Sequence, residues 1–166
     1  MRRGSLLALA LAALVAAPAL TGCSSHAKSR PAAATSTTVG PLRALTVKTY
    51  EYSYDVGQLT PLRVVAGHVP VSIRNAGGQS HEARFVRLRP GVTLAAVVIA
   101  LQRDPSGAGL SAVVTSVGGT GSIAPGARGQ VVVNVERGSY LMFCALRAPD
   151  GTPHFAKGML LPFTVP

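Results

Sequence analysis

Residues 143–159, FCALRAPDGTPHFAKGM, combine three residue types that are scarce in this chain. They hold one of the 2 cysteines (Cys144), one of the 4 histidines (His154) and one of the 3 methionines (Met159). An apolar run, YLMF, leads into the cysteine, whereas Pro and Gly surround the histidine. We therefore expect a strand that ends at Cys144, a loop that carries His154, and a further strand that begins near Met159.

Short strands are also expected throughout the rest of residues 41–166, because apolar residues alternate there between Gly and Pro. Arg137 and Gly138 predict a hairpin between two of these runs. Gly67 and His68 predict a turn between two others, so we expect His68 to be a structural residue and not a metal ligand. The pattern as a whole predicts an all-β sandwich or barrel. The runs are LTVKTYEYSY (45–54), LRVVAG (62–67), VPVSIRN (69–75), EARFVRLR (82–89), GQVVVNVE (129–136), SYLMFCAL (139–146) and GMLLPFTV (158–165).

One segment has helical periodicity instead. In GVTLAAVVIALQRD (91–104), Leu94, Val97 and Leu101 recur at helical spacing, and Thr93 can cap the first turn. We expect one helix inserted among the strands. The Gly-rich residues 105–129 that follow predict a long loop, in which LSAVVTSV (110–117) fits either a short strand or a lid.

The N-terminus, MRRGSLLALALAALVAAPALTGC (1–23), has a basic start and an apolar run too short to span a bilayer comfortably. Its ending, LTGC, resembles the lipobox of bacterial lipoproteins, which implies cleavage before Cys23 and a lipid on that thiol; the alternative is an ordinary secretory signal. We expect a signal peptide (1–22), a lipidated Cys23 with a flexible linker (23–40) and one domain (41–166). The protein would then be anchored in the bilayer at the extracytoplasmic face of the cell membrane.

A lipid on Cys23 would leave Cys144 as the only free thiol of the mature protein. An unpaired cysteine in an exported protein indicates intermolecular pairing, a reactive thiol or a metal ligand. A Cys23–Cys144 disulfide is the alternative, and the lipobox argues against it. The net charge of +10 suits an anionic membrane or an acidic redox partner. Nucleic acid is disfavoured, because the basic residues are scattered without interleaved aromatic residues.

The side chains able to bind a metal are Cys144, His154, Met159 and, upstream in NAGGQSH (75–81), His81. A thiolate, two imidazoles and a thioether form a soft-to-borderline donor set that suits copper. Two histidines and one cysteine in a plane, with a weak axial methionine, are the ligands of blue-copper electron-transfer sites. Zinc is less favoured, since its structural sites rarely use a thioether.

Residues 45–166 resemble the cupredoxin family in NAGGQSH and in YLMFCALRAPDGTPHFAKGM (140–159). The resemblance implies a Greek-key β-sandwich with one type 1 copper ion. By this resemblance, His81 and His154 are the imidazole ligands, Cys144 the thiolate and Met159 the axial thioether. The spacing from Cys144 to His154 is similar to the long ligand loop in the type 1 domain of copper nitrite reductases. The inserted helix resembles that of a subgroup of exported bacterial cupredoxin-like proteins.

Two residues could support the ligands by hydrogen bonds. Asn75 opens the turn before His81, and Glu82 follows that histidine where many cupredoxins have Asn. The Glu82 carboxylate could either bond near the site or face water.

An enzyme is less expected than a carrier. Phe143 stands where the nitrite reductases have a histidine for a second copper, and no hydrolase motif is present. Electron transfer is the favoured function. The alternatives are a copper-binding or copper-delivery lipoprotein without an electron-transfer role, and a metal-free cupredoxin-like interaction module.

Overall fold

The computed structural model describes residues 43–57, 62–106 and 108–166. The predicted signal peptide, Cys23 and the linker lie outside the described residues, so these predictions stay predictions. Within the described part of the chain, no helix is long and apolar enough to cross a membrane.

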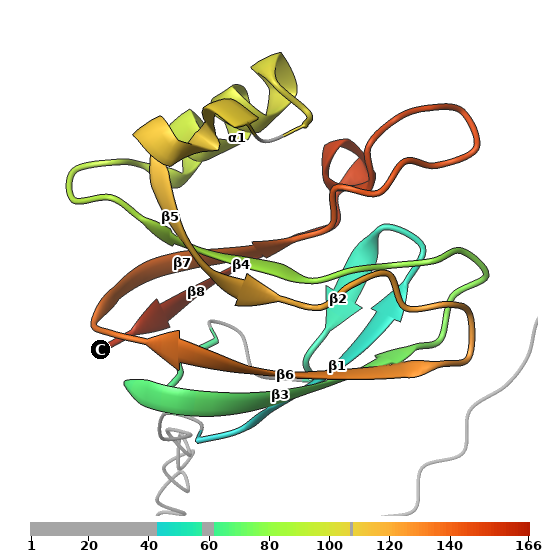
Figure 1. The fold of residues 1–166 in the computed structure, drawn as a ribbon, viewed down its shortest axis with the longest axis horizontal. Coiled ribbons are helices and arrows are strands. Elements are labelled where there is room, and N and C mark those ends of the chain that lie inside the picture. Colours follow the sequence, from blue (N-terminus) through green and yellow to red (C-terminus); the bar gives the residue numbers. More distant parts are fainter. Residues whose placement is uncertain (1–42, 58–61, 107) are drawn as a thin grey trace, which may run out of the picture. The chain divides into compact units, whose positions relative to one another are not determined.

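Two four-stranded sheets pack face to face, as Figure 1 shows. The first sheet has the order β2 (Ser53–Asp55), β1 (Leu45–Tyr50), β3 (Gly67–Asn75) and β6 (Arg128–Val135). The second has the order β5 (Val114–Gly119), β4 (Arg84–Leu88), β7 (Gly138–Phe143) and β8 (Leu160–Val165). β1 runs parallel to β3, and the other neighbours are antiparallel. The predicted all-β sandwich is confirmed.

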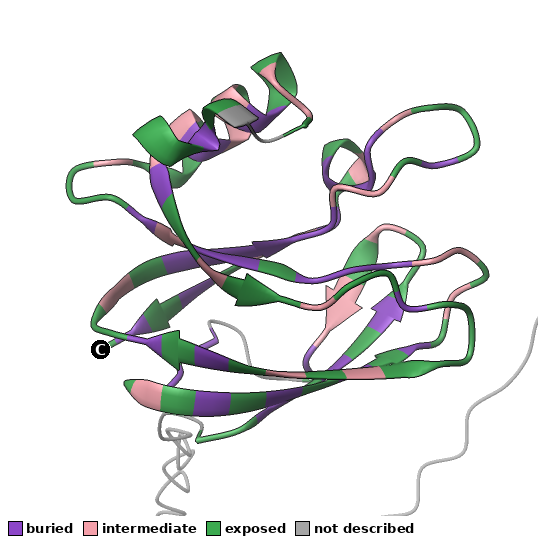
Figure 2. Ribbon diagram, viewed as in Figure 1, coloured by how far each residue is buried: buried purple, intermediate pink, exposed green. Residues whose placement is uncertain are grey.

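The main core lies between the sheets. β1 alternates buried and exposed residues along its length, because one face meets the core and the other meets water (Figure 2). β7 differs, since Tyr140 and Met142 pack in the main core whereas Leu141 and Phe143 pack in a second core on the opposite face. This explains the unbroken apolar run YLMF before Cys144.

The second core is covered by the predicted helix, which is confirmed as α1 (Leu94–Arg103). The Thr93 side chain accepts a hydrogen bond from the Ala96 amide, as expected of an N-cap. Val97 and Leu101 are fully buried against this face of the second sheet. The strand that leads to Cys144, β7, therefore has apolar cover on both faces: the main core covers one face and the helix covers the other.

The prediction of a long loop at residues 105–129 is wrong in part. The segment contains the short 3-10 helix η1 (Ala108–Ala112) and the edge strand β5, which pairs with β4. The strand alternative for residues 110–117 was thus the better one. Much of β5 is exposed, so it lacks the apolar alternation that reveals a strand in a sequence.

The predicted hairpin at Arg137 and Gly138 is also wrong. β6 belongs to the first sheet and β7 to the second, so these residues carry the chain from one sheet to the other. The Tyr140 hydroxyl holds this corner, because it donates to the Glu136 carbonyl (2.8 Å) and accepts from the Glu136 amide (2.9 Å). An alternation of apolar and polar residues along the sequence predicts strands, but it does not predict which strands pair with each other.

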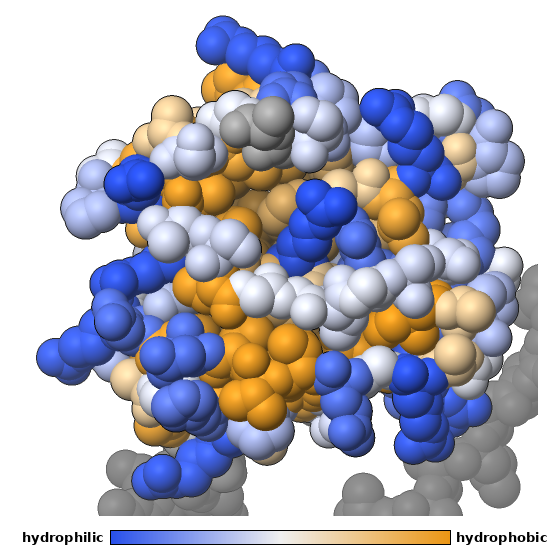
Figure 3. Space-filling view, in the orientation of Figure 1, coloured by the Kyte–Doolittle hydropathy of each residue, from blue (hydrophilic) through white to orange (hydrophobic). Residues whose placement is uncertain are grey.

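The turn predicted at Gly67 and His68 is absent as well, because both residues are part of β3. His68 lies opposite Asn134 of β6 and is exposed. The register places Val132 of β6 on the same face, where it is 59% exposed. Figure 3 shows apolar surface over β6 with hydrophilic side chains around it.

Candidate metal centre

Three potential ligands from separate parts of the chain meet at one end of the sandwich. His81 lies between β3 and β4, Cys144 directly follows β7, and His154 begins the 3-10 helix η2 (His154–Lys157). The two imidazole Nδ1 atoms lie 3.2 Å apart, and Cys144 Sγ lies 3.4 Å from His154 Nδ1. All three ligand atoms lie within 4.8 Å of one another, and all three residues are buried. The cluster can therefore hold a metal ion.

The long segment from Cys144 to His154 folds back on itself as a small hairpin. The His154 amide donates to the Leu146 carbonyl (2.8 Å), and the Ala148 amide donates to the Thr152 carbonyl (2.9 Å). A tight turn closes the tip, where the Gly151 amide donates to the Ala148 carbonyl (2.8 Å). The tip sequence APDG suits such a turn, and Gly151 has the positive φ of 79° that glycine tolerates.

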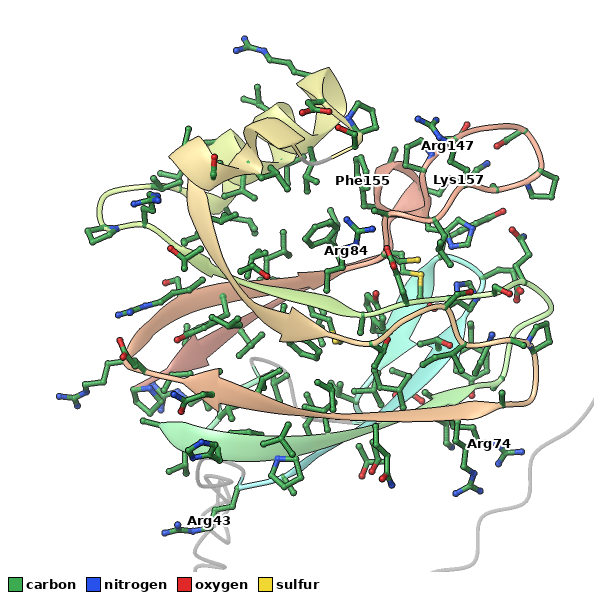
Figure 4. All side chains as sticks on the ribbon, in the orientation of Figure 1. Arg43, Arg74, Arg84, Arg147, Phe155 and Lys157 are labelled. Atoms are coloured by element: carbon green, nitrogen blue, oxygen red, sulfur yellow. The ribbon has the colours of Figure 1, made fainter. Side chains whose placement is uncertain are left out.

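A further hydrogen bond fastens the base of this hairpin, and an ion pair fastens its tip. The Phe155 amide donates to the Cys144 carbonyl (2.9 Å), and Lys157 Nζ lies 2.6 Å from Asp150 Oδ2. Figure 4 shows Arg147, Phe155 and Lys157 on this connection between β7 and β8. The length of the loop is thus accommodated without separating Cys144 from His154.

His81 is held by the Gly-rich segment. Its amide and carbonyl pair with the carbonyl and amide of Ile123, at 3.1 and 2.7 Å. The buried Asn75 side chain completes this arrangement, because its Nδ2 donates to Gln79 O (2.7 Å) and Ile123 O (2.9 Å). Its Oδ1 accepts from the Gly77 amide (2.9 Å). Asn75 therefore fixes the turn that leads to His81.

Glu82 is buried and points at the thiol loop instead of at water. Its Oε1 accepts from the Ala145 amide (3.0 Å) and from Arg84 Nε (2.8 Å). Its own amide donates to Cys144 Sγ (3.4 Å). Of the two alternatives for this carboxylate, the structure has the hydrogen-bonded one.

Met159 is fully buried beside these residues. Its amide donates to the His154 carbonyl (3.0 Å), and its carbonyl accepts from the Cys144 amide (3.3 Å). The backbone thus brings Met159 to both residues, and its role as a thioether ligand stays a prediction.

Burial disfavours charge at each of the three grouped residues. It lowers the pKa of His81 and of His154, and it raises the pKa of the Cys144 thiol. Backbone N–H groups of Glu82 and Leu146 oppose this rise in the thiol pKa, because they stabilise the thiolate. The histidines are therefore held in the neutral form that a metal requires, and the thiol must lose a proton when a metal binds.

The donor geometry fits a single metal ion. Metal–nitrogen bonds of about 2.0 Å and metal–sulfur bonds of about 2.3 Å separate ligand atoms by roughly 3.3–3.7 Å around one ion. The Nδ1–Nδ1 and Sγ–Nδ1 separations of 3.2 and 3.4 Å are close to this range. The Nε2 atoms of His81 and His154 are buried without a hydrogen-bond partner in the described residues. No hydrogen bond at Nε2 therefore opposes the ring orientation in which each Nδ1 atom faces the other ligand atoms.

Sequence reasoning missed two tyrosines at this site. The Tyr54 hydroxyl donates to the Glu82 carbonyl (2.5 Å), and the Tyr52 ring contacts the His154 ring edge to face, with centroids 5.1 Å apart. The spacing YEYSY (50–54) is a signal that could have drawn attention to them. The contribution of Ile123 had no comparable signal, since it lies in a segment that was expected to be a loop.

No protein-family model and no curated protein matches the chain. Among solved structures, auracyanin from Roseiflexus castenholzii is similar with 19% identity and a TM-score of 0.55, over 76% of this chain and 99% of that chain. Auracyanin A from Chloroflexus aurantiacus, described as a "blue" copper protein, has 18% identity and a TM-score of 0.52, over 76% and 100%.

Azurin from Methylomonas sp. strain J is similar at 18% identity, with a TM-score of 0.50 over 74% of this chain and 97% of that chain. These likenesses show that the chain has the cupredoxin fold, as the sequence predicted. They span almost the whole of each solved chain.

Proposed function

We propose that this protein is a type 1 copper electron carrier, anchored by a lipid on Cys23 at the extracytoplasmic face of a membrane. The observation that carries the proposal is the convergence of His81 Nδ1, His154 Nδ1 and Cys144 Sγ in a buried cluster of a cupredoxin fold. Copper would supply the one-electron exchange between its two oxidation states. His81, His154 and Cys144 would hold it, with Met159 as the fourth ligand.

The protein's own contribution is to keep these donors in place. Asn75 fixes the turn before His81, and Ile123 pairs with the backbone of His81 itself. Glu82, which follows His81, accepts a hydrogen bond from the amide of Ala145, which follows Cys144. Glu51 Oε1 lies 3.9 Å from His81 Nε2, where a negative charge favours a proton on that nitrogen and leaves Nδ1 free to bind metal. A centre that is braced in this way would change little when its charge changes, as an electron carrier requires.

The burial of His81, Cys144 and His154 argues against copper delivery as the main role, because a delivered ion must leave the protein readily. The basic charge of the chain suits an acidic redox partner near the membrane. The experiment is repeated reduction and reoxidation of the copper-loaded protein, with its copper content measured after each cycle. A carrier keeps its copper through every cycle, whereas loss of copper on reduction, with transfer to an acceptor protein, would contradict the proposal and favour delivery.

A further inference from the structure

One side of the metal centre is closed by a residue with an unusual backbone. His154 is only 1% exposed although it lies on a surface helix, and the Tyr52 ring packs against it with centroids 5.1 Å apart. Tyr52 lies in the turn between β1 and β2 and has a φ of 65°. Among the described residues, no other non-glycine residue has a positive φ. A bulky side chain disfavours this conformation, which is typical of residues held in place for function.

Contacts from two segments hold the Tyr52 ring over His154. Gln79 Nε2, from the segment that carries His81, donates to the Tyr52 hydroxyl (3.0 Å). Lys157, from the helix that carries His154, places Nζ 5.0 Å from the centre of the ring. The turn itself is fastened by Glu51 Oε1, which accepts hydrogen bonds from the Gly78 and Gln79 amides. Tyr52 is therefore tied to both histidine-bearing segments.

We propose that Tyr52 is the residue that determines which molecules reach the metal centre from the His154 side. Its ring excludes water and small ligands such as azide and imidazole from the metal. The inference rests on the proposed function in one respect, since the excluded ligands would otherwise bind the metal. The shielding of His154 is a property of the protein alone and can be tested without copper.

The first experiment measures carbethoxylation of single histidines in the full-length, metal-free protein with diethylpyrocarbonate, followed by mass spectrometry. Exposed His68 is the internal reference, and buried His81 reports general loosening. Tyr52→Gly removes the ring and suits the positive φ, so this variant should fold. Tyr52→Phe keeps the ring, and Tyr50→Ala removes a neighbouring tyrosine that is 40% exposed.

The expected result is an increase of about tenfold or more in the His154 rate in Tyr52→Gly, with His81 still slow. Tyr52→Phe and Tyr50→Ala should match the unmodified protein. An unchanged His154 rate in Tyr52→Gly would overturn the proposal. An equal increase at His81 would overturn it too, because Tyr52 would then support the whole site rather than shield one ligand.

The second experiment adds azide or imidazole to copper-loaded protein and follows the visible spectrum. Only Tyr52→Gly should show a change that saturates with ligand concentration, and equal changes in Tyr52→Phe would contradict the shielding. Failure of every variant to bind copper would refute the proposed function, while the histidine modification would still decide the role of Tyr52.

Discussion

Glu82 joins two segments that are far apart in the sequence and adjacent at the site. Its carboxylate accepts from the Ala145 amide next to Cys144, while its amide donates to the thiol itself. Arg84 adds an ion pair at 2.8 Å, but its side chain is 45% exposed and so contributes little. The hydrogen bond to Ala145 is therefore the main contribution of this side chain.

Glu82→Ala should lower the free energy of unfolding of the metal-free protein by about 1–3 kcal/mol, because a buried amide loses its acceptor. Glu82→Gln keeps an oxygen for that amide and should lose less. Urea titration of both variants at neutral pH measures the difference. Equal losses in the two variants would mean that the charge, rather than the hydrogen bond, is what matters.

The crossing from β6 to β7 joins the two sheets and sets the direction of the strand that ends at Cys144. Tyr140 is buried, and its hydroxyl makes both hydrogen bonds of this corner with the Glu136 backbone. Its ring stacks on Phe163 of β8 with centroids 5.0 Å apart. The corner is therefore held by one side chain in two ways.

Tyr140→Phe keeps the stacking and removes the hydroxyl, so we expect a loss of about 1–2 kcal/mol in the free energy of unfolding. Tyr50→Phe is the matched control, because that residue is 40% exposed and should lose almost nothing. Denaturant titration of the two variants provides the comparison, and equal stability of both variants would refute the importance of this corner.

These elements also show which features a sequence can predict. The helix was predictable because its signals, Thr93 and the spacing of Val97 and Leu101, are local. The supposed hairpin failed because pairing depends on contacts between distant strands. At the site, the order of His81, Cys144 and His154 along the chain was enough to predict that these three side chains lie together. The position of Tyr52 was not predictable, because a left-handed tyrosine has no pattern in the sequence.

For the molecule as a whole, pH should act through the buried histidines. Burial lowers the pKa of His81 and His154 from the ordinary value of 6.5, so the unfolded chain binds protons at a higher pH than the folded protein does. Their contribution to stability is complete above pH 6.5 and is lost as the pH falls through the lowered folded pKa values.

We therefore expect the urea midpoint of the metal-free protein to fall between pH 7.5 and pH 5, roughly the range in which ordinary histidines take up protons. Replacing both His81 and His154 by Gln should flatten this dependence. An equally steep fall in that double variant would assign the effect to other groups.

The central claim is that Cys144, with His81 and His154, binds one copper ion through its thiolate. Titration of the protein with Cu(II), followed by visible absorption, tests this claim most directly, with Cys144→Ser and Cys23→Ser as a matched pair. We predict an intense visible band that saturates at about one equivalent of copper, lost in Cys144→Ser and kept in Cys23→Ser. Copper binding with no such band in the unmodified protein, or an equal band in Cys144→Ser, would contradict the account.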